Sequence, residues 1–218
     1  MKKWAIILLS VLSLLPFSVT ASEAIKLTKA PIDLQDKVSL QNGAKLFVNY
    51  CQGCHTLKYL RYGRMAKDLD IKPELVQEYL IFTGAKIGDP MTNGMVDEAS
   101  KGWFGNPPPD LTYASRHRSP DWIYSYLLGF YSDASRPFGN NNKVFPNVSM
   151  PDVLYNMRHE LSKGEFEKNV ADLTNFLAYA AEPIRQEREQ LGVKVLIFLL
   201  ILLIPASLMK REYWKDVH

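Results

Sequence analysis

The sequence is poor in cysteine and nearly balanced in charge, and each feature excludes a class of protein. Two cysteines in 218 residues are too few for a disulfide-stapled scaffold. The 26 basic and 23 acidic residues leave a formal net charge of +3, far from the basic excess of a nucleic-acid-binding face. Internal repeats are also lacking. Hydrophobic residues make up 47% of the chain, a globular composition unlike that of a disordered or collagen-like chain.

Long apolar runs stand at the two ends of the chain, and the first has the form of an export signal. Lys2 and Lys3 precede an apolar run over 4–19, and small residues at 19–21 suit a signal peptidase. We therefore expect 1–21 to be a cleaved signal peptide. The alternative is an uncleaved anchor, because this run is nearly long enough to span a bilayer.

The second apolar run, 193–209, is about 25 Å long as a helix, slightly shorter than a typical hydrocarbon core, but Leu191 extends it and makes a membrane span feasible. Three basic residues follow it directly: Lys210, Arg211 and Lys215. Since basic residues prefer the cytoplasmic side, we expect an anchor over 191–210, a cytoplasmic tail over 211–218 and an exported domain over 22–190. A buried core helix is the alternative, but it does not explain the basic tail.

Both cysteines fall in one five-residue motif, Cys51-Gln52-Gly53-Cys54-His55. This is the attachment pattern of a c-type haem. Cysteines three residues apart lie on one side of a helical turn, so both sulfurs can reach the vinyl groups of one porphyrin. The imidazole of His55 then follows as a good iron ligand.

The motif has three other possible uses, in a disulfide, a redox pair or a zinc site. A disulfide is compatible with an oxidising compartment. A thioredoxin-like redox pair needs a surrounding βαβ pattern, which the sequence does not show. A zinc site needs a second pair of ligands at similar spacing. The export signal and the adjacent histidine together favour covalent haem.

The sixth iron ligand is less clear from residue chemistry. The candidates are Met65, Met91, Met95, Met150, Met157, His117 and His159. Met65 follows the motif too closely to reach the opposite haem face. Met91 and Met95 lie in a glycine-rich loop able to fold over a haem. Met150 precedes Pro151, which restricts the backbone before it and makes a stiff arm. These considerations favour Met150 and leave Met91 and Met95 open.

The remaining pattern predicts a mainly α-helical body with long loops. Apolar spacing predicts helices over 40–52, 73–82, 119–128 and 164–190, the last continuing almost directly into the membrane anchor. A proline-rich loop covers 102–109. Alternating patterns typical of strands do not stand out. A bound haem would supply much of the core in such a body.

Four segments make the chain resemble the cytochrome c1 family, over about 38–210. They are the haem motif continuing into Tyr59 and Tyr62, Pro108-Pro109-Asp110-Leu111-Thr112-Tyr113 with Arg116 after it, Met150-Pro151, and Phe176-Leu177-Ala178-Tyr179-Ala180-Ala181-Glu182-Pro183. The last is the most specific. One departure is Asp152 after Pro151, where many relatives have a second proline.

The resemblance implies a class I cytochrome c-like haem domain whose first and last helices cross near the haem, followed by one C-terminal transmembrane helix. It implies one covalently bound haem c, with Cys51 and Cys54 as thioether residues. It further implies His55 as the proximal ligand, Met150 as the distal ligand and Arg116 at a haem propionate.

The resemblance also implies a role as an electron-transfer subunit of a membrane quinol:cytochrome c oxidoreductase. Such a chain docks on cytochrome b in the inner membrane, with its haem domain in the periplasm. It passes single electrons from a Rieske iron–sulfur protein to a cytochrome c and is no enzyme by itself. The alternatives are an anchored monohaem cytochrome that donates to a terminal oxidase or reductase, and a haem sensor or peroxidase with an open sixth position.

Overall fold

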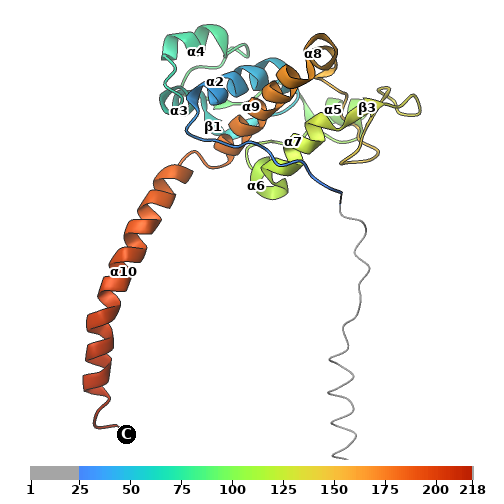
Figure 1. The fold of residues 1–218 in the computed structure, drawn as a ribbon. Coiled ribbons are helices and arrows are strands. Elements are labelled where there is room, and N and C mark those ends of the chain that lie inside the picture. Colours follow the sequence, from blue (N-terminus) through green and yellow to red (C-terminus); the bar gives the residue numbers. More distant parts are fainter. Residues whose placement is uncertain (1–24, 218) are drawn as a thin grey trace, which may run out of the picture.

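A computed structural model describes residues 25–217, so the expected signal peptide over 1–21 lies outside the described residues, as do residues 22–24 of the expected exported domain. Two helices from opposite ends of the described chain cross at the centre of the body (Figure 1). The first, α2 (Lys37–Leu46), begins at Asp36, whose carboxylate accepts a hydrogen bond from the Ser39 N–H. The second, α9 (Lys163–Ala181), begins with a capping box. This crossing agrees with the expected cytochrome c-like arrangement.

The two helices approach so closely because α2 presents a glycine at the crossing point. A Cβ placed on Gly43 would lie 2.6 Å from the Cβ of Phe176, and closer still to the carbonyl oxygen of Asp172. Beside this contact, Phe47 and Phe176 pack with ring centroids 5.9 Å apart. The missing side chain therefore sets the distance between α2 and α9.

We expect Gly43→Ala to lower the free energy of unfolding by about 3 kcal/mol, because the neighbouring backbone cannot move aside without separating the two helices. Gly102→Ala is the matched control. It lies in α5 (Asp97–Phe104), where an added Cβ meets nothing within 4 Å. Denaturant unfolding of both variants checks the prediction, and an equal effect of the two would contradict it.

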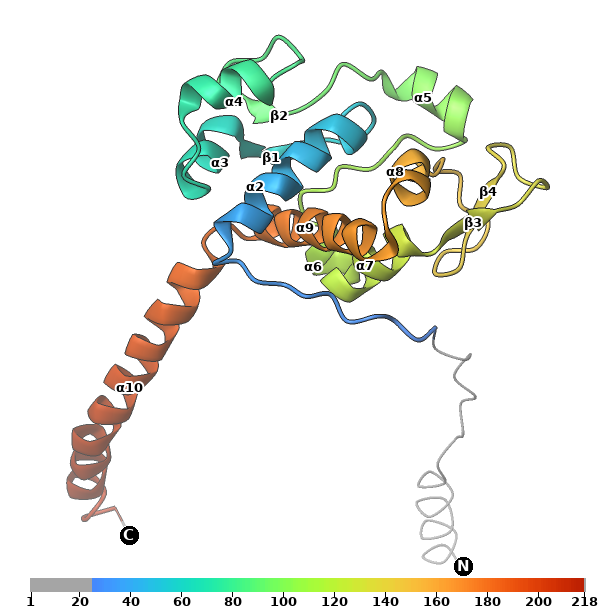
Figure 2. The same ribbon diagram turned by 45° about the horizontal axis from the view of Figure 1, so that its top comes forward.

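The other elements surround this crossing, apart from the last helix, which leaves the body (Figure 1). In chain order they are η1 (Phe47–Cys51), β1 (Leu57–Arg61), α3 (Tyr62–Asp68), α4 (Pro73–Tyr79), β2 (Pro90–Met91), α6 (Ala114–Arg118), α7 (Pro120–Leu128), β3 (Phe130–Ser132), β4 (Asn140–Asn142), α8 (Tyr155–Glu160) and α10 (Arg185–Tyr213). Figure 2 shows α9 between α2 on one side and α6 with α7 on the other. The body is mainly helical, as the sequence predicts.

Two small antiparallel sheets are present that the sequence pattern does not reveal. Strand β1 pairs with β2 through Leu57 and Met91, and β3 pairs with β4 through Phe130 and Asn142. Strands of two to five residues are too short to show a clear alternation of apolar and polar side chains. Leu57 and Met91 of the first pair are fully buried in the core.

Three of the expected helices have clearly different ends in the structure, and the one expected over 73–82 ends at Tyr79 as α4. The helix expected over 40–52 starts earlier, as α2, and changes to a π-helical turn at Phe47. The helix expected over 164–190 ends at Ala181, and its last charged turns belong to α10 instead. Pro183 explains this break, because a proline disfavours helical backbone at the residue before it, and Glu182 is extended at φ −157°.

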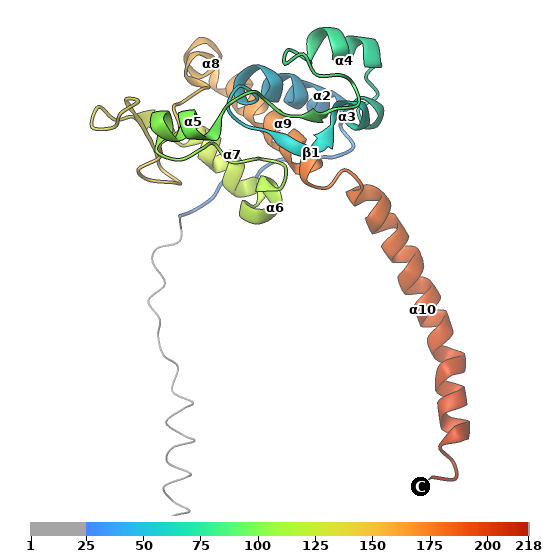
Figure 3. The same ribbon diagram turned by 180° about the vertical axis from the view of Figure 1, so that it is seen from behind.

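Helix α10 leaves the body as a separate rod (Figure 3). Among the described residues it alone is long and apolar enough to cross a membrane, and none of its apolar stretch is buried against the body. Leu196, Leu200 and Leu203 are all more than half exposed, which is costly in water and favourable in lipid. The helix continues through Pro205, as membrane helices tolerate.

Candidate haem site

The π-helical turn η1 delivers the cysteine motif to the edge of the core. Cys51 ends this turn, and its carbonyl oxygen accepts hydrogen bonds from the N–H groups of Cys54 at 3.1 Å and His55 at 2.8 Å. Cys51 is buried and Cys54 partly buried, and both are free thiols. Burial raises the pKa of both thiols, that of Cys51 to about 12 with a further contribution from Cys54. The two sulfurs and the imidazole thus belong to one turn.

The imidazole of His55 is oriented by a main-chain carbonyl. Its Nδ1 lies 2.8 Å from the carbonyl oxygen of Pro109, which can only accept, so Nδ1 carries the proton. The lone pair is therefore on Nε2, as metal ligation requires. Burial lowers the pKa of His55, although the Pro109 carbonyl and the Asp110 charge oppose this shift. A neutral, fixed imidazole is a ready iron ligand.

The Asp110 carboxylate holds this carbonyl in place by tying the proline loop to the residues after the motif. It accepts hydrogen bonds from the Thr56 hydroxyl at 2.6 Å and from the Lys58 N–H at 2.8 Å. The Leu111 N–H adds a bond to the Thr56 carbonyl at 2.8 Å. Partial burial works to raise the pKa of Asp110, but these hydrogen bonds and those of Thr112 hold it below its usual value. Asp110 therefore stays ionised at neutral pH.

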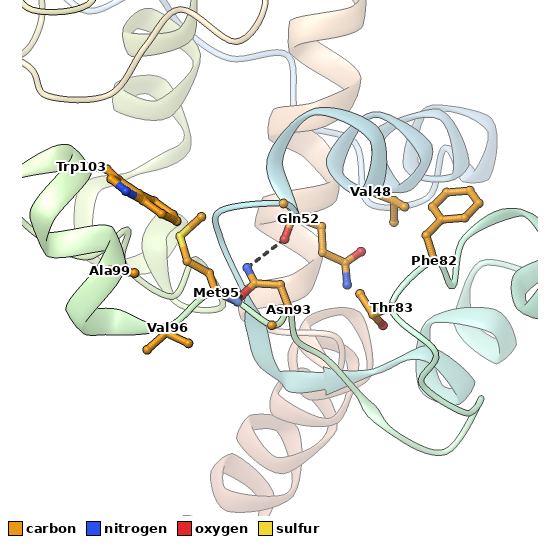
Figure 4. Close-up of a pocket in the computed structure, with 11 residues that line it drawn as sticks. Val48, Gln52, Phe82, Thr83, Asn93, Met95, Val96, Ala99 and Trp103 are labelled. Atoms are coloured by element: carbon orange, nitrogen blue, oxygen red, sulfur yellow. Dashed lines mark hydrogen bonds between the residues drawn. The ribbon is translucent and has the colours of Figure 1, made fainter.

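A loop residue that the sequence did not single out secures the other side of the motif. The amide of Asn93 donates to the carbonyl oxygen of Gln52 at 2.8 Å and to that of His55 at 3.2 Å. Figure 4 shows this contact at a cleft of about 490 Å³, with Met95 and Trp103 on one side of it and Phe82 on the other. The glycine-rich loop thus contacts the motif through the side chain of an asparagine.

Met150 lies on a separate arm, after β4 and before α8. Its sulfur accepts a hydrogen bond from the Tyr126 hydroxyl of α7 at 3.3 Å. Burial raises the pKa of Tyr126, with a contribution from Asp152, so this hydroxyl keeps its proton. The Asn140 amide donates to the Met150 carbonyl at 3.0 Å. Met150 is therefore held both at its main-chain carbonyl and at its side-chain sulfur.

The other candidate ligands are placed differently. Met91 and Met65 are fully buried in the apolar core, where they fill space. Met95 lines the cleft beside the motif. His117 is exposed on α6, and His159 is exposed on α8 with its Nδ1 2.7 Å from the Tyr155 carbonyl. Met150 thus remains the candidate with a dedicated set of contacts.

Arg116 lies at an exposed position of α6 and pairs with a carboxylate of the chain. Its Nη1 is 2.7 Å from Glu182, which also binds Arg188 at 2.5 Å. The side chain of Arg116 is 58% exposed, so much of the guanidinium stays in contact with solvent. Its contact with a haem propionate stays a prediction.

The residues present fit a covalently attached haem. The motif supplies two free thiols and a neutral imidazole with an available Nε2, and the Met150 arm supplies a soft sulfur ligand. Sequence reasoning assigned no role in the site to Pro109, Asp110, Asn93, Tyr126 or Asn140. Each acts through a contact with a residue 10 to 54 positions away, so a local pattern does not announce it.

The chain is similar to known proteins over nearly its whole length. A family model described as the Cytochrome C1 family matches residues 28–217. Cytochrome c1 of Allochromatium vinosum is 46% identical, covering 98% of this chain and 99% of its own. A protein of Nitrosomonas europaea named ammonia monooxygenase gamma subunit is 40% identical, covering 97% of each chain. A solved chain titled Hyperthermophilic respiratory Complex III is 14% identical with a TM-score of 0.46, covering 99% and 98%.

The family model covers nearly all of the described chain, and the Allochromatium vinosum relative is similar over its full length. The chain belongs to the cytochrome c1 family.

Proposed function

We propose that Cys51 and Cys54 bind the haem through two thioether bonds and that His55 and Met150 are its axial ligands. The observation that carries this proposal is the 2.8 Å contact of the His55 Nδ1 with the Pro109 carbonyl, beside two free thiols in the same turn. The contact fixes the tautomer that a proximal ligand needs. When bound, haem c supplies one-electron redox chemistry at a potential raised by its methionine ligand.

The chain is the electron-transfer subunit of a quinol:cytochrome c oxidoreductase and carries one covalent haem c. We propose that it passes single electrons from a Rieske iron–sulfur protein to a cytochrome c. Its own residues need only bind, orient and tune. We further propose that none acts as acid, base or nucleophile, and that quinol oxidation belongs to the whole complex.

We propose that α10 anchors the chain in the inner membrane, beside cytochrome b, with the haem domain in the periplasm. Lys210 and Arg211 stand at the end of the apolar stretch, where they favour the cytoplasmic side. The proposed boundaries are 22–190 for the exported domain and 191–210 for the anchor. The charged first turns of α10, from Arg185 onward, then lie at the periplasmic interface.

A reduced-minus-oxidised spectrum of the tagged full chain, purified with its partners from mildly solubilised membranes, tests this function. We expect a c-type signal together with b-type haem that quinol reduces. A c-type signal alone would favour a separate anchored carrier. The name of the Nitrosomonas europaea relative refers to a different enzyme, so the identity of the co-purifying subunits is a second readout. The lack of any c-type signal would contradict the proposal.

A further inference from the structure

Three consecutive buried asparagines in β4 organise the arm that carries Met150. The Asn140 side chain binds the main chain on both sides of Pro151, with Nδ2 donating to the Met150 carbonyl at 3.0 Å and Oδ1 accepting from the Asp152 N–H at 3.2 Å. Asn142 donates to the Tyr126 carbonyl at 2.7 Å and so fixes β4 against α7. All three asparagines are less than 10% exposed. The amides of Asn140 and Asn142 are therefore fixed by these contacts, and that of Asn141 binds the Asp133 carboxylate at 2.9 Å.

The departure at Asp152 contributes directly to this arrangement. Asp152 supplies the N–H that Asn140 accepts, and a proline at this position has no N–H to give. The Asp152 carboxylate also pairs with Arg158 at 3.3 Å, and Arg158 donates to the Leu127 and Leu128 carbonyls at the end of α7. The residues after the methionine are thus tied to the helix that carries Tyr126.

Tyr126 reaches the sulfur from a rigid position. Its ring stacks on Trp122 with centroids 5.0 Å apart and 9° between the planes, and it meets Phe130 edge-on at 5.1 Å. These contacts hold the ring, and the hydroxyl is left to donate to the Met150 sulfur at 3.3 Å. A phenylalanine keeps both ring contacts and lacks only the donor. The packing and the hydrogen bond are therefore separable by mutation.

We propose that Tyr126 and Asn140 are positioning residues for Met150, Tyr126 by setting the donor strength of the sulfur and Asn140 by fixing the main chain around it. This inference rests on the proposed ligation by Met150. A hydrogen bond to the thioether withdraws electron density, so the sulfur stabilises ferric iron less and the reduction potential rises. The clamp at Asn140 keeps the arm from swinging away when another ligand competes.

The test is an optical redox titration of the haem-loaded full chain in detergent, comparing Tyr126→Phe with Tyr124→Phe. Tyr124 lies on the same helix, and its hydroxyl binds the Glu167 carbonyl at 3.5 Å rather than the methionine. At a fixed ambient potential near the midpoint, we expect Tyr126→Phe to lower the ratio of reduced to oxidised haem about threefold. Tyr124→Phe should leave this ratio unchanged.

The second measurement is imidazole binding to the oxidised protein, followed by its absorption spectrum. Asn140→Ala removes both bonds of the clamp, so we expect imidazole to displace the methionine at about tenfold lower concentration. Tyr126→Phe should not weaken the methionine against imidazole, because the sulfur becomes a better donor. Easier displacement in Asn140→Ala, without easier displacement in Tyr126→Phe, would support two separate roles.

Failure of the inference and failure of the ligation have different signatures. If Met150→Leu changes the oxidised spectrum but Tyr126→Phe and Asn140→Ala match wild type in both measurements, Met150 is a ligand and the inference is wrong. If Met150→Leu leaves the oxidised spectrum unchanged, the proposed ligation is wrong and the inference fails with it.

Discussion

Replacement of Met150 by leucine is expected to lower the haem reduction potential by on the order of 0.2 V, because axial ligands set haem potentials over a range of about 0.8 V. A soft thioether favours ferrous iron, and leucine offers no donor in its place. A change of 0.2 V is more than a thousandfold in the equilibrium constant of a one-electron step, since about 59 mV corresponds to tenfold. Electron transfer to a cytochrome c should then nearly stop.

Met95→Leu is the matched control for this experiment. Met95 lines the cleft beside the motif and is a candidate ligand by sequence. Its main-chain N–H donates to the Asn93 side chain within the same glycine-rich loop. We expect its potential and its oxidised spectrum to equal those of wild type. A redox titration that moves with Met95→Leu and not with Met150→Leu would transfer the ligand role to Met95.

Local features of this protein were predictable because they are carried by neighbouring residues. The cysteine motif is five residues long, and the structure places its thiols and imidazole in one turn. The start of α4 at Pro73 and that of α7 at Pro120 follow from the preference of proline for the first turn of a helix. The long apolar run at the C-terminus likewise predicted the exposed part of α10.

Features that depend on distant contacts were not predictable. The pairing of Leu57 with Met91 buries a methionine that sequence reasoning kept as a possible ligand. The sequence predicts only a proline-rich loop over 102–109, but the group that contacts His55 is the Pro109 carbonyl, which every residue type possesses. Its value comes from lying beside His55, and that neighbour is 54 residues away. Only the packing of the chain reveals such a role.

The break after α9 is a case in which a single residue overrides the periodic pattern of the sequence. Apolar spacing runs on through Ala181 and the charged residues beyond it extend a helical pattern, so one continuous helix was expected. Pro183 overrides this pattern by preventing helical backbone at Glu182. Glu182 is then free of the helix and pairs with Arg116 and Arg188. The proline thus separates the haem body from its anchor and creates an ion-pair junction between them.

Loss of both thiols should abolish covalent haem. We expect the Cys51→Ser, Cys54→Ser double variant to lose all haem that survives a denaturing gel, because the chain has no other cysteine to form a thioether. Its level in the membrane should fall below about a tenth of wild type, because a domain with so little sheet and so many loops depends on its prosthetic group for part of its core. Haem staining and immunoblotting of the same gel measure both effects.

The two single variants should differ, since the two cysteines are buried to different extents. Cys51 belongs to the buried apolar core, whereas Cys54 is only partly buried. Each variant keeps one thioether, but Cys51→Ser also buries a hydroxyl in apolar surroundings, which costs about 1–3 kcal/mol. We therefore expect a lower melting temperature for Cys51→Ser than for Cys54→Ser at equal haem content. Equal melting temperatures would show that the attached haem, and not the packing of Cys51, determines the stability of the turn.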